Sequence, residues 1–387
     1  MYKIQTLNNI SVKGLDRLPR ERYEVASEIA HPDAVLLRSY NMHDMAIPET
    51  LMAVGRAGAG VNNVPVGAMT ERGIPVFNAP GANANAVKEL VIAGMLLGCR
   101  NICQGWDYVQ HLEGQDEALS RQVESGKKQF AGFELPGRTL GVIGLGSIGV
   151  KVANTARALG MKVIGFDPQI TVDRAWQLSA DVEGAASIDD LLARSEFVTF
   201  HVPLTDATEH MINRERLRHM PENVVILNFA REGIVDEEAV CEALDESRVY
   251  AYVTDFPSNR VKGHPRVVAL PHIGASTQEA QENCAVMVAD QVREYLEDGN
   301  VTNSVNFPDV HLPRKGRARL AVVNRNVPDM LGQISHDLGK VGVNIVHMIN
   351  ESEEEVAYTL VDCDSDIDAE TRAAIEDISG VLRVRVI

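Results

Sequence analysis

The sequence predicts an α/β protein made of two doubly wound parallel-sheet domains and a C-terminal ferredoxin-like module. Short apolar runs recur along most of the chain, and segments with helical periodicity separate them, which is the pattern of parallel strands and crossover helices. The C-terminal residues 318–387 instead follow the order strand, helix, strand, strand, helix, strand, which predicts the ferredoxin-like module.

The composition is that of a multidomain globular protein. The chain has 387 residues, 45% of them hydrophobic and 24% charged. Its formal charge of -17 argues against a nucleic-acid surface, which needs clustered Lys and Arg. The apolar run Leu90–Cys99 is too short for a membrane span, which takes about 20 residues. We therefore expect neither nucleic acid nor a membrane as a partner.

The N-terminus and the cysteines indicate a cytoplasmic protein. Met1-Tyr2-Lys3 opens into a mixed segment without the basic start and apolar middle of a secretory signal. The five cysteines are scattered and form no C-x-x-C pair, so we expect neither a disulfide framework nor a metal site.

The strands expected in the first domain cover residues 34–39, 51–56 and 73–77, and those in the second cover 139–143, 162–167, 197–202, 224–229, 249–255 and 267–270. A helix should begin at the capping sequence Ser187-Ile188-Asp189-Asp190. A long helix over 277–299 would return the chain to the first domain. Prolines and a basic run predict a linker at 308–317. The expected division is 1–92 and 283–307 for the first domain, 93–282 for the second, and 318–387 for the module.

A glycine motif gives the strongest functional signal. The run Gly144-Leu145-Gly146-Ser147-Ile148-Gly149 follows a strand and opens a helix, as in Rossmann-like dinucleotide sites. Gly144 permits the tight turn, Gly146 admits the pyrophosphate, and Gly149 lets the helix pack against the strand. Asp167 ends the next strand, where a carboxylate accepts hydrogen bonds from the adenosine ribose, so we expect NAD rather than NADP. Arg174 is the nearest basic residue that could fold back to a ribose phosphate.

Four ordered blocks resemble the D-2-hydroxyacid dehydrogenases. They are residues 54–63 (VGRAGAGVNN), 200–204 (FHVPL), 228–236 (NFAREGIVD) and 271–277 (PHIGAST). The resemblance covers nearly the whole chain and is greatest to the members that oxidise 3-phosphoglycerate to 3-phosphohydroxypyruvate, the first step of serine biosynthesis. The C-terminal module resembles the ACT domain that some of these members carry.

The resemblance implies roles for residues at the ends of the predicted strands. Arg231 would bind the substrate carboxylate, and its guanidinium fork suits that partner. His272 would take the hydroxyl proton, and an imidazole titrates in the right range. An ion pair with Asp236 or Glu237 is the alternative for Arg231. The further residues implied at the cofactor are His201, Ala230, Asp255 and Gly274, although His201 in its apolar run also fits a structural residue.

One position departs from the family pattern. A glutamate usually follows the strand that ends at Asp255 and stabilises the charged histidine, but this chain reads Asp255-Phe256-Pro257-Ser258-Asn259. Asn259 takes that place, and an amide can orient an imidazole without stabilising its charge as a carboxylate does.

The resemblance also implies the substrate and regulatory residues. Arg38 and Arg56 would face a substrate phosphate, beside Ala57 and Gly58, with Lys127 or Lys128 added from a neighbouring subunit of a dimer or tetramer. Reduction of hydroxypyruvate or glyoxylate, or dinucleotide sensing without turnover, remain as alternatives. In the module, Asn324, Asn326 and Asn344 are the expected contacts for a serine effector. Asp329 stands where the family has glycine. The alternative is that the module binds no effector and only joins subunits.

Overall fold

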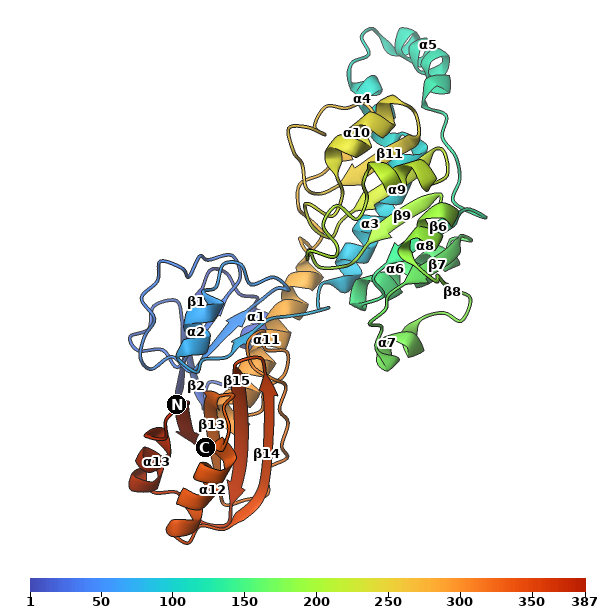
Figure 1. The fold of residues 1–387 in the computed structure, drawn as a ribbon. Helices are drawn as coiled ribbons and strands as arrows, with labels where there is room; N and C mark the ends of the chain where they lie inside the picture. Colours follow the sequence, from blue (N-terminus) through green and yellow to red (C-terminus); the bar gives the residue numbers. More distant parts are fainter. The chain divides into compact units, whose positions relative to one another are not determined.

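A computed structural model describes residues 1–387 as two compact units (Figure 1). The first unit comprises Met1–Asn83 and Gln278–Ile387, and the second comprises Ala84–Thr277. The chain passes between the units at the first residues of α3 (Ala84–Arg100) and α11 (Gln278–Asp298). The boundaries expected from sequence, at 92 and 282, lie inside these helices. None of the helices combines the length and apolar character that a membrane span requires.

The first unit begins with a parallel five-stranded sheet of order β2-β1-β3-β4-β5. Its strands are β1 (Tyr2–Leu7), β2 (Tyr23–Ala26), β3 (Ala34–Leu37), β4 (Ala53–Arg56) and β5 (Val76–Phe77). The three predicted strands are present. The helices α1 (Val12–Leu15), α2 (Val66–Glu71) and α11 accompany the sheet.

The second unit contains a parallel seven-stranded sheet of order β12-β11-β10-β9-β6-β7-β8, which is doubly wound. Side chains of α3 and α6 form one hydrophobic core with one face of the sheet, and those of α8, α9 and α10 form another with the opposite face. Ser187 accepts a hydrogen bond from the backbone N–H of Asp190 and caps α8, as predicted. The strands are β6 (Thr139–Ile143), β7 (Lys162–Phe166), β8 (Glu183–Gly184), β9 (Phe197–Phe200), β10 (Val224–Asn228), β11 (Val249–Thr254) and β12 (Val267–Ala269); the helices besides α3 are α4 (Ile102–Gln110), α5 (Asp116–Gly126), the 3₁₀ helix η1 (Lys127–Phe130), α6 (Ser147–Ala158), α7 (Val172–Gln177), α8 (Ile188–Arg194), α9 (Arg214–His219) and α10 (Glu237–Asp245).

The C-terminal module is an antiparallel four-stranded sheet of order β14-β15-β13-β16 with two helices, the ferredoxin-like arrangement that the sequence predicted. One face of this sheet packs on α12 and α13, and the other joins the core of the first unit. The module therefore belongs to the first unit. Its elements are β13 (Ala318–Arg325), α12 (Met330–Lys340), β14 (Ile345–Glu353), β15 (Val356–Cys363), α13 (Ala369–Glu376) and β16 (Val381–Val386).

The module also binds the C-terminal end of α11, whose last carbonyl groups lack partners within the helix. Arg385 donates to the carbonyl oxygens of Tyr295 and Leu296, and Arg319 donates to that of Asp298. The Tyr358 hydroxyl donates to the carbonyl oxygen of Gly299. These bonds stabilise the negative end of the helix dipole with two positive side chains.

The segment predicted as a linker, 308–317, is packed against the first unit. Val310 and Leu312 are buried, and Val310 forms a β-bridge with Val301. Arg314 donates to the carbonyl oxygen of Ile387, and Arg317 pairs with Asp366. Partners that are distant in sequence thus hold the prolines and basic residues in place.

Candidate functional site

The glycine-rich turn joins β6 to α6. Gly144 has a φ of +90°, and a Cβ there would lie 2.5 Å from the carbonyl oxygen of His201. A Cβ on Gly149 would overlap the carbonyl oxygen of Gly144. Nothing lies within 4 Å of the Cβ position of Gly146, which is the N-cap of α6 and leaves room for a pyrophosphate beside the free N–H groups of Ser147 and Ile148.

The Asp167 carboxylate lies beside this turn, directly after β7. One oxygen accepts a hydrogen bond from the backbone N–H of Leu145 at 2.8 Å, and the other accepts from that of Gln169 at 2.9 Å. Each carboxylate oxygen has a further lone pair, so the fixed carboxylate can still accept the hydroxyl groups of a ribose. The turn and Asp167 together fit the adenosine diphosphate part of NAD.

The other residues expected at the cofactor follow the central and outer strands of the same sheet. His201 and Asp255 come directly after β9 and β11, Ala230 is the second residue after β10, and Gly274 lies in the loop after β12. Burial lowers the pKa of His201 to about 3, and its Nε2 lies 3.2 Å from the Thr199 hydroxyl, so the ring is neutral at neutral pH. Since the carboxyl ends of parallel strands meet at one edge, these residues share the edge where ligands bind in such sheets.

Arg231, His272 and Asp255 are the ionisable residues at this edge for which the sequence predicted a role in catalysis or cofactor binding. Asp255 is only 1% exposed, and its Oδ1 has no hydrogen-bond partner. Burial raises the pKa of Asp255, while the positive charges of His272 and Arg231 oppose this, so the three groups interact electrostatically. The exposed His272 ring also packs edge-on against Phe256 at 4.9 Å between centroids.

Arg231 forms no ion pair with a carboxylate. It is exposed, and its Nη1 donates to the carbonyl oxygen of Ala230 rather than to a carboxylate. Asp236, which sequence offered as an ion-pair partner, instead accepts backbone N–H groups at the N-terminus of α10. Glu237 accepts from the Ser258 hydroxyl.

Asn259 lies exposed in the loop after β11. The adjoining residues of this loop point toward α10, where Ser258 donates to Glu237 and Arg260 pairs with Glu238. The carboxylate that interacts with His272 is that of Asp255. The sequence analysis gave Asp255 a cofactor role only, because the sequence does not show how deeply a residue at the end of a strand is buried.

In the first unit, Arg38 and Arg56 lie side by side at the carboxyl ends of β3 and β4. Arg56 Nε donates to the carbonyl oxygen of Arg38 at 3.1 Å, and burial lowers the pKa of Arg56, with the positive charge of Arg38 acting in the same direction. Neither guanidinium has a carboxylate partner among the ion pairs of the chain. The Arg56 guanidinium occupies the space that a side chain on Gly58 would fill, and Ala57 is buried.

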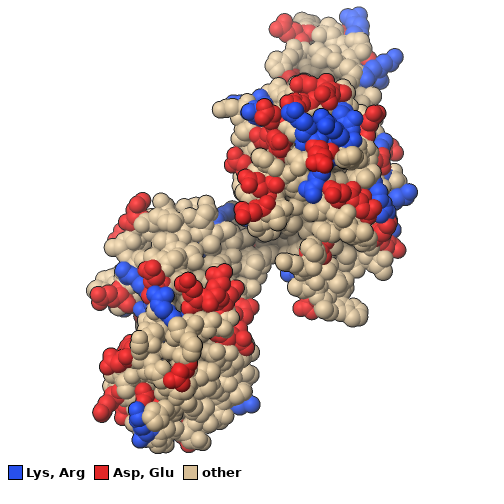
Figure 2. Space-filling view, in the orientation of Figure 1, with Lys and Arg blue, Asp and Glu red and all other residues tan.

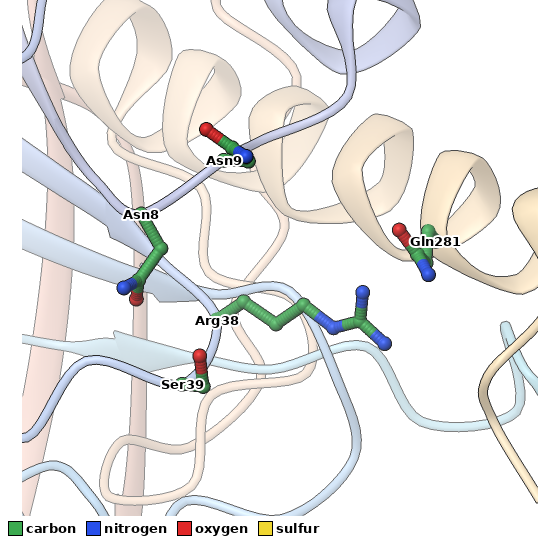
Figure 3. A pocket seen from close by; sticks show the side chains of 5 residues that line it. All are labelled: Asn8, Asn9, Arg38, Ser39 and Gln281. Carbon is green, nitrogen blue, oxygen red and sulfur yellow. The ribbon is translucent and has the colours of Figure 1, made fainter. Parts of the chain in front are cut away.

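Arg38 also lines a pocket of about 480 Å³ with Asn8, Asn9, Ser39 and Gln281 (Figure 3). Asn8 and Asn9 follow β1, and Gln281 comes from the first turns of α11. Sequence analysis missed Asn8 and Asn9 because it did not predict β1, and it missed Gln281 because that residue is remote in sequence; it predicted a strand over 34–39 without assigning Ser39 to a site.

The remaining predicted residues have other partners. Lys127 is exposed in η1 and pairs with Glu124. Asn324 is buried and donates to the carbonyl oxygen of Arg325, whereas Asn326 is exposed and donates to that of Glu354. Asn344 is exposed, with its backbone N–H bonded to Asp364.

The chain is similar to known dehydrogenases. Residues 92–274 match the model of the D-isomer specific 2-hydroxyacid dehydrogenase NAD binding domain. The D-3-phosphoglycerate dehydrogenase of Methanocaldococcus jannaschii is 38% identical over 85% of this chain and 62% of its own length. That of Escherichia coli K12 is 32% identical over 88% of this chain and 82% of its own length. The chain thus spans under two thirds of the archaeal relative and most of the bacterial one.

Solved structures show the same fold. An NAD⁺-bound 3-phosphoglycerate dehydrogenase from Entamoeba histolytica has a TM-score of 0.60 and 27% identity, covering 79% of this chain and 98% of its own. A glyoxylate reductase from Paecilomyes thermophila has a TM-score of 0.62 and 26% identity over 79% and 98% of the two chains. With its glycine-rich turn, Asp167 and the Arg231–His272 edge, the chain belongs to the D-isomer-specific 2-hydroxyacid dehydrogenase family and carries that family's NAD-binding domain.

Proposed function

We propose that the protein oxidises 3-phosphoglycerate to 3-phosphohydroxypyruvate with NAD, the first step of serine biosynthesis. The observation that carries the proposal is the pair Arg38 and Arg56, two adjacent arginines without a carboxylate partner in a chain of formal charge -17. Like charges repel each other, so such a pair is stabilised when an anion binds. A substrate phosphate supplies that anion, and it suits the planar guanidinium groups.

The residues of the second unit have the chemistry of the oxidation. Arg231 binds the substrate carboxylate, and His272 takes the proton of the hydroxyl group as general base. The negative charge of Asp255 favours the imidazolium that this transfer produces. NAD, when bound, would supply the acceptor for the hydride on the carbon that carries this hydroxyl group.

The first experiment follows NADH absorbance with 3-phosphoglycerate, glyoxylate and hydroxypyruvate as substrates. We expect 3-phosphoglycerate to be the best substrate, and Arg38→Gln to raise its KM about tenfold or more while leaving the KM for glyoxylate unchanged. Arg20→Gln, which removes an exposed charge of the same unit, is the matched control. An equal effect of Arg38→Gln on both substrates would argue against a phosphate contact.

Reduction of glyoxylate or hydroxypyruvate is the second candidate, and the likeness to the Paecilomyes thermophila reductase favours it. Turnover of these substrates without turnover of 3-phosphoglycerate would establish it. His272→Ala separates both enzymes from a dinucleotide sensor: we expect a loss of about 10²–10⁴-fold in turnover with NADH binding retained. For the cofactor, Asp167→Ala should weaken the preference for NAD, and equal efficiency with NADP in the parent would contradict that role.

The protein is proposed to act as a cytoplasmic homo-oligomer, a dimer or tetramer. Ile102, Trp106 and Val109 form an exposed apolar stripe on α4, which a second copy would cover. All five cysteines are free, as expected in a reducing compartment. In such an assembly Lys127 would add a positive charge to the substrate site of a neighbour. Sedimentation of the parent and of Trp106→Glu tests whether the stripe is a subunit interface. A monomeric parent would contradict this role.

We infer that the C-terminal module acts as an ACT-like regulatory domain that binds serine. The exposed amides of Asn326 and Asn344 can both donate and accept hydrogen bonds, as the amino and carboxylate groups of serine require. The buried Asn324 would support its neighbours rather than reach the ligand. Calorimetry with serine on the parent and on Asn344→Ala decides this: no heat and no inhibition at millimolar serine would leave the module as an assembly domain.

A further inference from the structure

Arg174 reaches back from α7 to the glycine-rich turn. Its Nη2 donates to the hydroxyl of Ser147, the first residue of α6, at 2.7 Å. Its Nη1 lies 3.3 Å from the amide oxygen of Gln177. The side chain is half-buried and forms no ion pair with an acidic residue, so its charge is not neutralised within the chain.

The glycine-rich turn lacks a positive side chain of its own. Residues 144–149 contain no Lys or Arg, and the nearest one on α6, Lys151, is exposed. A pyrophosphate carries two negative charges, whereas the N-terminus of a helix contributes about half a positive charge. An additional cation at this turn would therefore strengthen cofactor binding.

The position of Arg174 distinguishes between the phosphates that it can bind. Both oxygens of Asp167 accept backbone N–H groups, which fix this carboxylate, and it forms no ion pair with Arg174. The guanidinium instead lies at Ser147, whose N–H begins the α6 helix and faces the pyrophosphate. On the surface of the second unit, Lys and Arg lie in small groups among Asp and Glu (Figure 2). Several of these basic residues form ion pairs, as Arg194 does with Glu183, whereas Arg174 forms none.

We propose that Arg174, positioned by Ser147, donates to the pyrophosphate of bound NAD and supplies the positive charge that the glycine-rich turn lacks. The guanidinium has five N–H donors, of which the bonds to Ser147 and Gln177 use two, so two more can bind phosphate oxygens as a fork. This inference rests on the NAD-binding domain alone and is independent of which hydroxy acid the enzyme oxidises.

The test measures binding rather than turnover. Energy transfer from tryptophan to NADH gives the signal, because Trp176 lies on α7 two positions after Arg174. Arg174→Gln should weaken the binding of NADH and of competing ADP-ribose about tenfold or more, as expected for lost hydrogen bonds to a charged group. Adenosine, which lacks the pyrophosphate, should compete equally well with the parent and the variant.

Three further variants complete the design. Arg174→Lys should restore part of the affinity, because it keeps the charge but not the fork. Ser147→Ala should cause a smaller loss than Arg174→Gln, since it removes only the positioning bond. Lys151→Gln removes an exposed charge from α6, is the matched control for the loss of a charge, and should change the affinity little. Unchanged NADH and ADP-ribose binding in Arg174→Gln would overturn the proposal, and so would a loss confined to NADPH, which would assign Arg174 to a ribose phosphate.

Discussion

Removing the carboxylate of Asp362 should destabilise the first unit strongly. The side chains of Asp362 and Arg319 are both 0% exposed and form two parallel hydrogen bonds of 2.7 and 2.9 Å. Arg319 also donates to Asp298 at the end of α11, so the pair joins the C-terminal module to that helix. Asp362→Ala leaves a buried guanidinium without its counter-charge, and breaking a buried pair in this way costs about 3–5 kcal/mol.

The pH dependence of this contribution has a definite sign. Burial would raise the pKa of Asp362, but the hydrogen bonds from Arg319 and from the backbone N–H of Lys315 outweigh it and hold the pKa below its ordinary value of 3.8. A carboxyl whose pKa is lower in the folded state stabilises the protein above the unfolded pKa. The difference between parent and variant should therefore be constant near neutral pH and shrink as the pH falls below about 5.

Urea unfolding followed by two signals measures the effect. Both tryptophans, Trp106 and Trp176, lie in the second unit, so their fluorescence reports that unit, while circular dichroism reports the whole chain. Asp362→Ala should shift the circular dichroism transition and leave the fluorescence transition in place. Asp366→Ala breaks the surface pair with Arg317, whose side chains are 70% and 68% exposed, and should cost no more than about 1 kcal/mol.

The apolar replacement separates the cost of an unpaired charge from the strength of the pair. Arg319→Met combined with Asp362→Leu removes both charges, and we expect it to be less destabilising than Asp362→Ala alone. If Asp362→Ala lowers the free energy of unfolding no more than the Asp366→Ala control does, the reasoning is refuted.

Three further predictions concern the turn, the module and Asp255. Gly149→Ala should abolish tight NADH binding without unfolding the chain, because its Cβ would displace the carbonyl of Gly144; tight binding by a folded variant would contradict this. Asp329 has a φ of +69° and makes no capping bond. Glycine would relieve the left-handed strain of about 1–2 kcal/mol but lose about 0.5–1 kcal/mol more chain entropy on folding, so thermal unfolding should show that Asp329→Gly stabilises the protein by about 0.5–1 kcal/mol. Asp255→Asn should move the acid limb of the kcat/KM profile to lower pH, whereas Asn259→Ala should not; the reverse result would assign the role to the amide.

The strands that sequence predicted and those that it missed differ in burial. All four residues of β9 and all five of β10 are buried, and continuous apolar runs of this kind are easy to recognise. β1 contains Lys3 and Gln5 and has one buried residue, so its sequence resembles that of a loop. The short β8 is exposed throughout.

The element order of the C-terminal module was predictable, but its place in the first unit was not. Prolines and basic residues between Phe307 and Ala318 are typical of a linker, and nothing local shows that Arg314 and Arg317 find partners beyond residue 360. One signal was present in β15. All eight of its residues are buried, and a strand of an antiparallel sheet without polar alternation predicts that both faces are covered.

The candidate site divides in the same way between local and distant signals. Glycine spacing predicted the turn because the backbone there leaves no room for a side chain at fixed positions of the motif. At Gly149, for example, a Cβ would overlap the carbonyl oxygen of Gly144. The group beside His272 was different, since the sequence offered only Asn259 for the place of the missing glutamate and gave Asp255 a cofactor role. Asp255 is buried at a strand end with an unpartnered oxygen, and Asn259 lies exposed in the following loop. Burial raises the pKa of Asp255 while the charges of His272 and Arg231 oppose this, so under our proposal Asp255 would take the electrostatic part that the family pattern gives to a glutamate.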